Sequence, residues 1–175
     1  MTRTPDIPLL IENHVGESTD SGIPSTVEVL KHPLHPLIVT FPIAFLVGAL
    51  GTDIGYWVTQ DAFWARASVW LLGVGFISGL VAALTGMLDF LRIDRVRKRQ
   101  SGWIHMIGNI VALTLTLVNW LLRLGRPADS VSLIGLVLSL VVASLLGFTG
   151  WHGAELIYRH KIAVIGHTSR QEPEL

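Results

Sequence analysis

The sequence contains no cysteine. Disulfides, thiolate nucleophiles, iron–sulfur clusters and Cys-type zinc sites are therefore excluded, and His, Asp and Glu remain as candidate metal ligands. Charge is also scarce, because only 15% of the 175 residues are charged and the formal net charge is zero. A chain without a positive excess does not fit a nucleic-acid-binding protein. We also find no hydrolytic triad spacing and no phosphate-binding loop, so no enzyme class is assigned.

Apolar residues are abundant, at 50% of the chain, and the mean hydropathy is +0.54. Spanning about 30 Å of hydrocarbon takes roughly 20 helical residues, and within lipid the backbone must satisfy its own hydrogen bonds. Four apolar stretches are long enough, at about 37–57, 67–88, 103–122 and 131–151. The sequence thus predicts an all-α, polytopic membrane four-helix bundle that contacts the lipid bilayer.

The remaining chain divides around this bundle. Residues 1–31 form a polar N-terminal segment, 32–157 the four-span domain, and 158–175 a tail. We expect no cleavable signal peptide, because the first 35 residues carry five acidic side chains and no apolar core. Ten Lys and Arg lie on the side of both termini and three on the other, so both termini are predicted to be cytoplasmic.

Glycine pairs with a spacing of four residues occur in the first two spans, as Gly51 with Gly55 and Gly75 with Gly79. This spacing lets helix backbones approach closely in lipid. Two interpretations remain open: tight packing inside one bundle, or the face of a homo-oligomer.

An internal repeat is suggested by matching helix ends. The first span opens on Leu34-His35-Pro36-Leu37-Ile38 and the third on Ile104-His105-Met106-Ile107. The second closes on the segment 84–89, which we align with 148–153 at the close of the fourth. Two helical hairpins related by an axis along the membrane normal would produce this pattern.

Polar side chains gather at the predicted cytoplasmic end. His35 starts the first span, Asp89 ends the second, His105 starts the third and His152 ends the fourth. Ionisable groups at membrane depth are costly and usually face a bundle interior. The candidate ligands of a metal are therefore His35, Asp89, His105 and His152, with supporting residues His32, Asn109, Glu155 and His160. The alternative is that these histidines are merely interfacial.

The most distinctive motif is His32-Pro33-Leu34-His35-Pro36. Each proline disfavours helix at the preceding residue, so the motif could aim His35 over the mouth of the bundle. Pro42 is predicted to kink the first helix.

Two further polar features stand apart. Asp53 and Asn119 are expected near the opposite surface, within reach of water, although a second polar end of a pathway stays open. The basic loop 92–99 is expected to interact with anionic lipid headgroups. The alternative is that this loop docks a soluble redox partner.

The chain resembles an uncharacterised bacterial family of four-span membrane domains, which is marked by the His-Pro-Leu-His-Pro start. The resemblance covers roughly residues 30–165. It rests on 32–36 with Pro42, Thr85-Gly86 with Asp89, Trp103 and His105 with Asn109, and 150–160. Some members of the family look to be joined to or encoded beside Rieske-type ferredoxin domains, which implies a redox setting. We expect this chain to lie in the bacterial inner (cytoplasmic) membrane.

Three hypotheses follow. The first is a b-type haem electron-transfer module, with His35 and His105 as ligands and His152 as the substitute for either. The second is a protein that binds or transports a Zn, Cu or Fe ion. The third is a scaffold subunit of a larger membrane complex.

Overall fold

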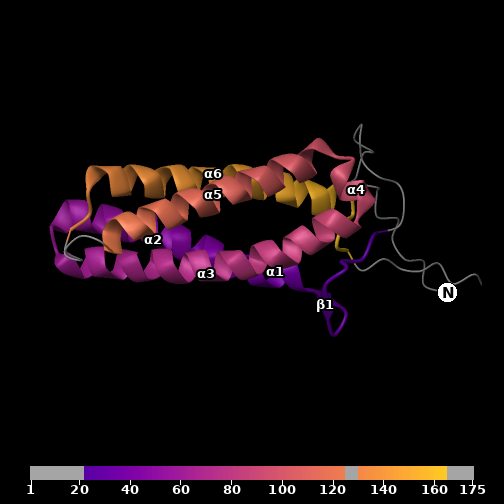
Figure 1. Ribbon diagram of the computed structural model, residues 1–175, viewed down its shortest axis with the longest axis horizontal. Coiled ribbons are helices and arrows are strands. Elements are labelled where there is room, and N and C mark those ends of the chain that lie inside the picture. Colours follow the sequence, from indigo (N-terminus) through magenta and orange to yellow (C-terminus); the bar gives the residue numbers. More distant parts are fainter. Residues whose placement is uncertain (1–21, 125–129, 165–175) are drawn as a thin grey trace, which may run out of the picture.

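The computed structural model describes residues 22–124 and 130–164. Four long helices lie side by side along the long axis of the molecule, and the small elements β1 and α4 lie at one end (Figure 1). In chain order the elements are β1 (Glu28–Val29), β2 (His32–Pro33), α1 (Leu34–Ile38), α2 (Thr40–Thr59), α3 (Ala62–Arg92), α4 (Asp94–Arg97), α5 (Gln100–Leu124) and α6 (Leu133–Tyr158). The predicted all-α four-helix bundle is thereby confirmed.

The first three helices extend beyond the predicted spans at both ends, and the fourth begins two residues later than predicted and ends seven residues later. The prediction ended each span at the edge of the hydrocarbon. Four segments are long and apolar enough to cross a membrane: Leu34–Thr59, Ala62–Arg92, Gln100–Leu124 and Leu133–Tyr158. The Asp61 carboxylate caps the start of α3 by accepting the Phe63 N–H at 2.8 Å. The Ser132 hydroxyl caps α6 by accepting the Gly135 N–H at 3.2 Å. Of the predicted N-terminal segment and tail, residues 1–21 and 165–175 lie outside the described residues.

The first span is interrupted at Val39, between α1 and α2. Pro42 explains the position, because proline has no N–H to give the Ile38 carbonyl, which would be its partner four residues earlier. Continuity is restored by the Ile43 N–H, which donates to the Val39 carbonyl at 3.4 Å. The expected irregularity near Pro42 is thus present, and it separates the turn that carries His35 from the rest of the span.

The bundle buries polar side chains together with apolar ones and exposes large apolar side chains, unlike a soluble protein. Buried side chains include Asp53, Ser68, Thr116, Asn119 and Ser139, each no more than 1% exposed. The outer surface carries large apolar side chains, among them Phe41, Ile54, Ile77, Leu140 and Phe148. A surface of this kind is stable against lipid tails and not against water. The protein is an integral membrane protein.

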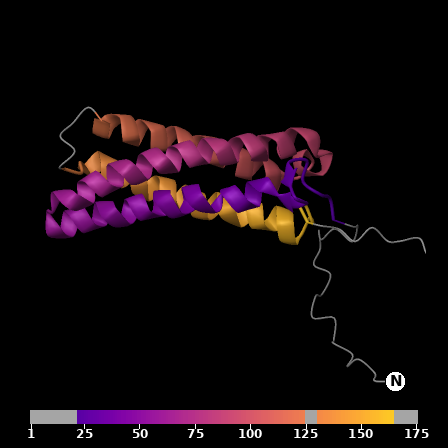
Figure 2. The same cartoon turned by 90° about the horizontal axis from the view of Figure 1, so that it is seen from below.

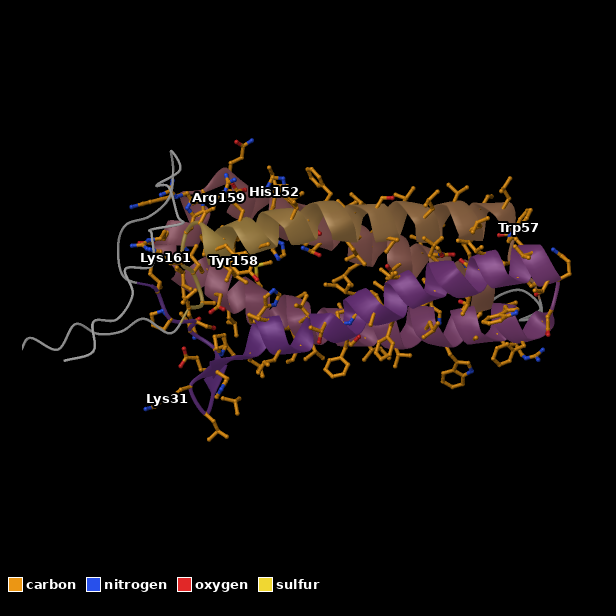
Figure 3. The ribbon with its side chains drawn as sticks, turned by 180° about the vertical axis from the view of Figure 1, so that it is seen from behind. Lys31, Trp57, His152, Tyr158, Arg159 and Lys161 are labelled. Atoms are coloured by element: carbon orange, nitrogen blue, oxygen red, sulfur yellow. The ribbon has the colours of Figure 1, made fainter. Side chains whose placement is uncertain are left out.

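Tryptophans near the ends of the spans divide into two groups. Trp57, Trp70, Trp103 and Trp151 are between 43% and 77% exposed, and Trp57 lies at one end of the bundle (Figure 3). Trp64 and Trp120 pack inward, where a Cβ added to Gly55 or Gly73 would lie 2.9 Å from the respective indole. Only the first group has the exposure of an interfacial anchor.

The glycines of the second pair allow close packing within the bundle. A Cβ at Gly75 would lie 2.6 Å from Leu46 and one at Gly79 would lie 2.5 Å from Leu113, so both glycines pack the bundle itself. Gly51 has no heavy atom within 4 Å of its ideal Cβ position. The first of the two interpretations therefore holds for Gly75 and Gly79, while a homo-oligomer through Gly51 stays a prediction.

The helices form a ring in which α2 contacts α3 and α6, and α5 contacts α6 and α3. Figures 1 and 2 show the two antiparallel hairpins, α2–α3 and α5–α6, from two directions. Every buried residue of α2 lies 70 residues before a buried residue of α5; the pairs are Pro42–Ala112, Leu46–Thr116, Ala49–Asn119 and Asp53–Arg123. Every buried residue of α6 lies 67 residues after a buried residue of α3; the pairs are Ser68–Gly135, Leu72–Ser139, Gly75–Val142, Ala82–Thr149 and Asp89–Leu156.

The two hairpins thus repeat each other's pattern of buried residues, as expected of an internal repeat. The alignment of 84–89 with 148–153 was wrong by three residues, because it matched the two Thr-Gly dipeptides at an offset of 64. The buried faces set the offset at 67, which pairs Gly86 with Gly153.

Candidate cofactor site

His35 is held on the first turn of the bundle by α3. Its Nδ1 lies 2.8 Å from the Ala82 carbonyl. A carbonyl oxygen only accepts, so Nδ1 carries the proton and Nε2 keeps its lone pair. The ring lies against Gly86, where a Cβ would be 2.8 Å from the imidazole. The absence of a side chain at Gly86 is what allows this close approach.

His105 repeats the arrangement on the other hairpin. Its Nδ1 lies 2.8 Å from the Thr149 carbonyl, and a Cβ at Gly153 would lie 2.8 Å from its ring. Asn109 adds a bond from its Nδ2 to the His105 carbonyl at 2.7 Å. Both histidines therefore present the same tautomer on equivalent backbone positions, as repeat mates.

The two imidazoles, one from each hairpin, lie close together. Their ring centroids are 6.1 Å apart and the ring planes are perpendicular. Both rings are half-buried, and no hydrogen bond to either Nε2 is found within the described part of the chain. The pair offers two free imidazole lone pairs.

A cavity of about 400 Å³ surrounds the pair. Its wall is mostly apolar and includes small residues that leave room between the helices, namely Gly79, Ala82, Ala83, Gly86, Gly150 and Gly153. The lining also follows the repeat, since Val39, Ile43 and Gly86 are matched by Asn109, Leu113 and Gly153. The cavity has the size and apolar character of a small-molecule or cofactor site.

The other predicted ligands lie apart from this pair. His152 does not line the cavity; its Nδ1 is buried without a hydrogen bond, 3.4 Å from Glu155 Oε2, and its ring packs on Phe148. Asp89 lines the cavity, but its oxygens accept hydrogen bonds from Ser25 and Thr26. Among the described residues, no group of three or more His, Asp or Glu is placed to hold a metal ion.

The predicted supporting residues have other partners. His32 is exposed, and its Nδ1 lies 2.8 Å from the Leu30 carbonyl in the β1–β2 hairpin. Glu155 accepts from the Ser101 hydroxyl at 2.6 Å and pairs with Arg159 at 3.3 Å. His160 is 7% exposed, just beyond the end of α6. Only Asn109 supports a histidine of the pair directly.

A second polar cluster lies at the opposite end of the bundle, and the sequence analysis missed its central residue. Arg123, which follows the predicted third span, is 7% exposed and forms a bidentate ion pair with Asp53, both bonds being 2.7 Å. Its Nε donates to Asn119 at 3.0 Å, Nη1 to Ser68 at 2.7 Å, and Nη2 to Ser139 at 3.3 Å. All five guanidinium N–H groups are thereby satisfied.

This cluster joins all four long helices. Asp53 is 0% exposed, so the expectation that it lies within reach of water was wrong. A Cβ at Gly135 would lie 3.1 Å from Arg123 Nη2, and the Gly135 carbonyl accepts from Asn119 at 3.2 Å. The signal in the sequence was the 70-residue spacing that pairs Asp53 with Arg123, equal to that between His35 and His105. Because every donor is occupied, the cluster has the character of a structural tie between helices.

Comparison with known proteins gives one match. A family model described as "Predicted membrane protein (DUF2231)" matches residues 31–166, a range that contains all four long helices and both histidines of the pair. No curated protein and no solved structure matches the chain.

Proposed function

We propose that this chain, which belongs to the DUF2231 family of predicted membrane proteins, is a b-type haem-binding electron-transfer module in which His35 and His105 would hold the haem. The observation that carries the proposal is the 6.1 Å separation of the two imidazole centroids. A metal about 2 Å from each ligating nitrogen would set facing imidazole centres about 6 Å apart.

The tautomers support the same assignment. Ligating histidines usually donate their other ring N–H to a carbonyl or carboxylate, which fixes the ring and raises its basicity. The Nδ1 atoms of His35 and His105 do so, at 2.8 Å from the carbonyls of Ala82 and Thr149. Each Nε2 is thus left as the donor atom for a metal.

The number of ligands favours haem over a bare ion. Zinc sites take three or four protein ligands, and within residues 22–124 and 130–164 no third His, Asp or Glu joins the pair. A porphyrin supplies its own four nitrogens, so two imidazoles complete the site. The apolar wall of the cavity suits a flat, apolar macrocycle.

If His35 and His105 both bound the iron, no position on it would remain open for a substrate, which favours electron transfer. Such a cofactor supplies one-electron chemistry, and the chain holds its ligands rigid through two backbone carbonyls. The basic segment 92–99 lies at the same end of the bundle as the histidines and would face the soluble electron partner; Arg92 and Lys98 are exposed there.

The test is an absorption spectrum of the purified protein, oxidised and reduced, with a metal assay on the same sample. We expect a Soret band and about one iron per chain. His35→Ala or His105→Ala should each lower haem content at least tenfold, whereas His32→Ala should leave it unchanged, because His32 is exposed and bonds only its own hairpin.

The competing hypotheses give different results. Bound zinc or copper without haem would overturn the haem proposal and support the metal-ion alternative. A protein with neither haem nor metal would leave the scaffold hypothesis.

A further inference from the structure

Two short segments from opposite ends of the described chain pair with each other at the histidine end of the bundle. We name residues 22–27 the strap and residues 161–164 the tail segment. The Ile23 N–H donates to the Lys161 carbonyl at 2.9 Å, and Ile23 forms a parallel bridge with Ile162. Ile162 is 5% exposed and lines the cavity, so this contact lies beside the cavity wall.

Apolar packing seals the region below the strap. Buried side chains gather there from α3, the α3–α4 junction, α4, α6 and the tail segment: Phe90, Ile93, Val96, Leu156 and Ile162. Ile23 of the strap packs on this cluster, as do Met87 and Met106, which line the cavity next to the histidines. The strap therefore packs on an apolar cluster that borders the cavity wall.

The strap is attached to the bundle through one carboxylate. Asp89, which is 8% exposed, accepts the Thr26 N–H at 2.7 Å, the Thr26 hydroxyl at 2.8 Å and the Ser25 hydroxyl at 2.7 Å. Ser25 is itself 7% exposed. Hydrogen bonds to a buried carboxylate are among the strongest in proteins, so Asp89 is the main polar anchor of the strap.

Asp89 has no polar counterpart in the second hairpin. The residue 67 positions after Asp89 is Leu156, which packs in the apolar cluster and offers no acceptor. The polar group at this position is therefore not needed for packing the two hairpins. It is explained by the strap that it holds.

We propose that the strap and the tail segment form a lid over the histidine cavity, and that Asp89 holds this lid closed and thereby sets access to the cavity from the aqueous side. The proposal concerns the cavity and not the identity of its ligand, so it stands apart from the haem assignment. Access sideways from lipid, between the helices, is the competing route.

The absence of cysteine makes the test direct, because a single introduced thiol is the only one in the chain. Met106→Cys, and separately Met87→Cys, places that thiol on the cavity wall. The protein in lipid nanodiscs is treated with a charged maleimide that does not enter lipid, and the labelling rate is measured with Asp89 intact and in an Asp89→Asn background. We expect slow labelling with Asp89 and at least tenfold faster labelling without it.

Lys31→Cys is the matched control, since Lys31 is exposed at the same end and its labelling rate should not change. Ser25→Ala with Thr26→Val removes hydroxyl donors from the strap side and should accelerate labelling of the cavity thiol while Asp89 remains. Unchanged melting temperature in either background separates an open lid from a damaged fold. Equal labelling rates in all backgrounds, or labelling by a lipid-permeant maleimide alone, would overturn the proposal.

Discussion

At the scale of the residue, the buried guanidinium of Arg123 is the most constrained group in the bundle. Burying an ion pair costs several kcal/mol of desolvation per charge, and only excellent geometry with further hydrogen bonds offsets it. Asp53 and Arg123 meet that condition through two bonds to each other and three to Asn119, Ser68 and Ser139. Breaking one partner leaves the other charge buried without compensation.

Arg123→Leu and Asp53→Leu should each lower the free energy of unfolding by about 3–5 kcal/mol. The double variant should be less destabilised than the sum of the two, because it leaves no unpaired charge. Unfolding by a denaturing detergent, followed by circular dichroism, gives the three values. Additive effects would show that the pair is not coupled.

His160 gives a pH-dependent prediction. Burial lowers the pKa of His160, and the positive charge of Arg99 lowers it further. The folded protein therefore resists protonating His160, whereas the unfolded chain protonates it near pH 6.5. The free energy of unfolding should be highest above pH 6.5. It should fall as the pH drops through 6.5 toward the lower pKa that His160 has in the folded protein.

Thermal melts between pH 7.5 and 5 should show this loss. His160→Phe, which keeps a buried neutral ring, should flatten the profile in this range. If His160→Phe shows the same change of melting temperature with pH as the wild type, the pH dependence comes from another group.

At the scale of the element, the sequence predicted which segments are helices but not how they meet. Four apolar runs longer than the hydrocarbon thickness leave only helices as a solution, so the elements followed from length alone. The ion pair of Arg123 could not be predicted from length. A charged residue at the end of an apolar run can face either water or the bundle interior, and its position in the sequence does not say which. The three-residue error in the repeat arose for a similar reason: a shared dipeptide is weaker evidence than a shared buried face.

Substitutions at Gly86 and Gly153 test whether the close approach of these glycines positions the two histidine rings. Gly86→Ala and Gly153→Ala would each place a methyl group 2.8 Å from an imidazole, so the ring must move. We expect either substitution to reduce haem content or shift the Soret band, and the double variant to bind none. Gly147→Ala is the control, because nothing lies within 4 Å of its Cβ position. If the three single variants gave identical spectra, the glycines would not be positioning the histidines.

At the scale of the whole molecule, the sequence predicted the membrane domain and placed His35 and His105 at one depth, where their ring centroids lie 6.1 Å apart. It grouped Asp89 and His152 with them, because residues at one depth in different helices were taken to share one site. Depth alone does not fix the direction of a side chain around its helix. Asp89 points to the strap and His152 toward Glu155.

The predicted orientation, with both termini in the cytoplasm, is testable by labelling in intact cells. Lys31→Cys lies at the histidine end and Gln60→Cys in the α2–α3 turn at the other end, and both positions are exposed. An impermeant maleimide added outside bacterial cells with a permeabilised outer membrane should label Gln60→Cys and spare Lys31→Cys until the inner membrane is disrupted. The reverse pattern would invert the topology.

The pairing of Asp53 with Arg123 at equivalent positions bears on why the four helices share one polypeptide. Two copies of the first hairpin, associated in the same way, would bring two carboxylates together without a counter-ion, and two copies of the second would bring two guanidinium groups together. Association of two identical hairpins is thus disfavoured by like charges, and association of the two different hairpins is favoured by the ion pair. A covalent connection guarantees that every assembled bundle contains one of each.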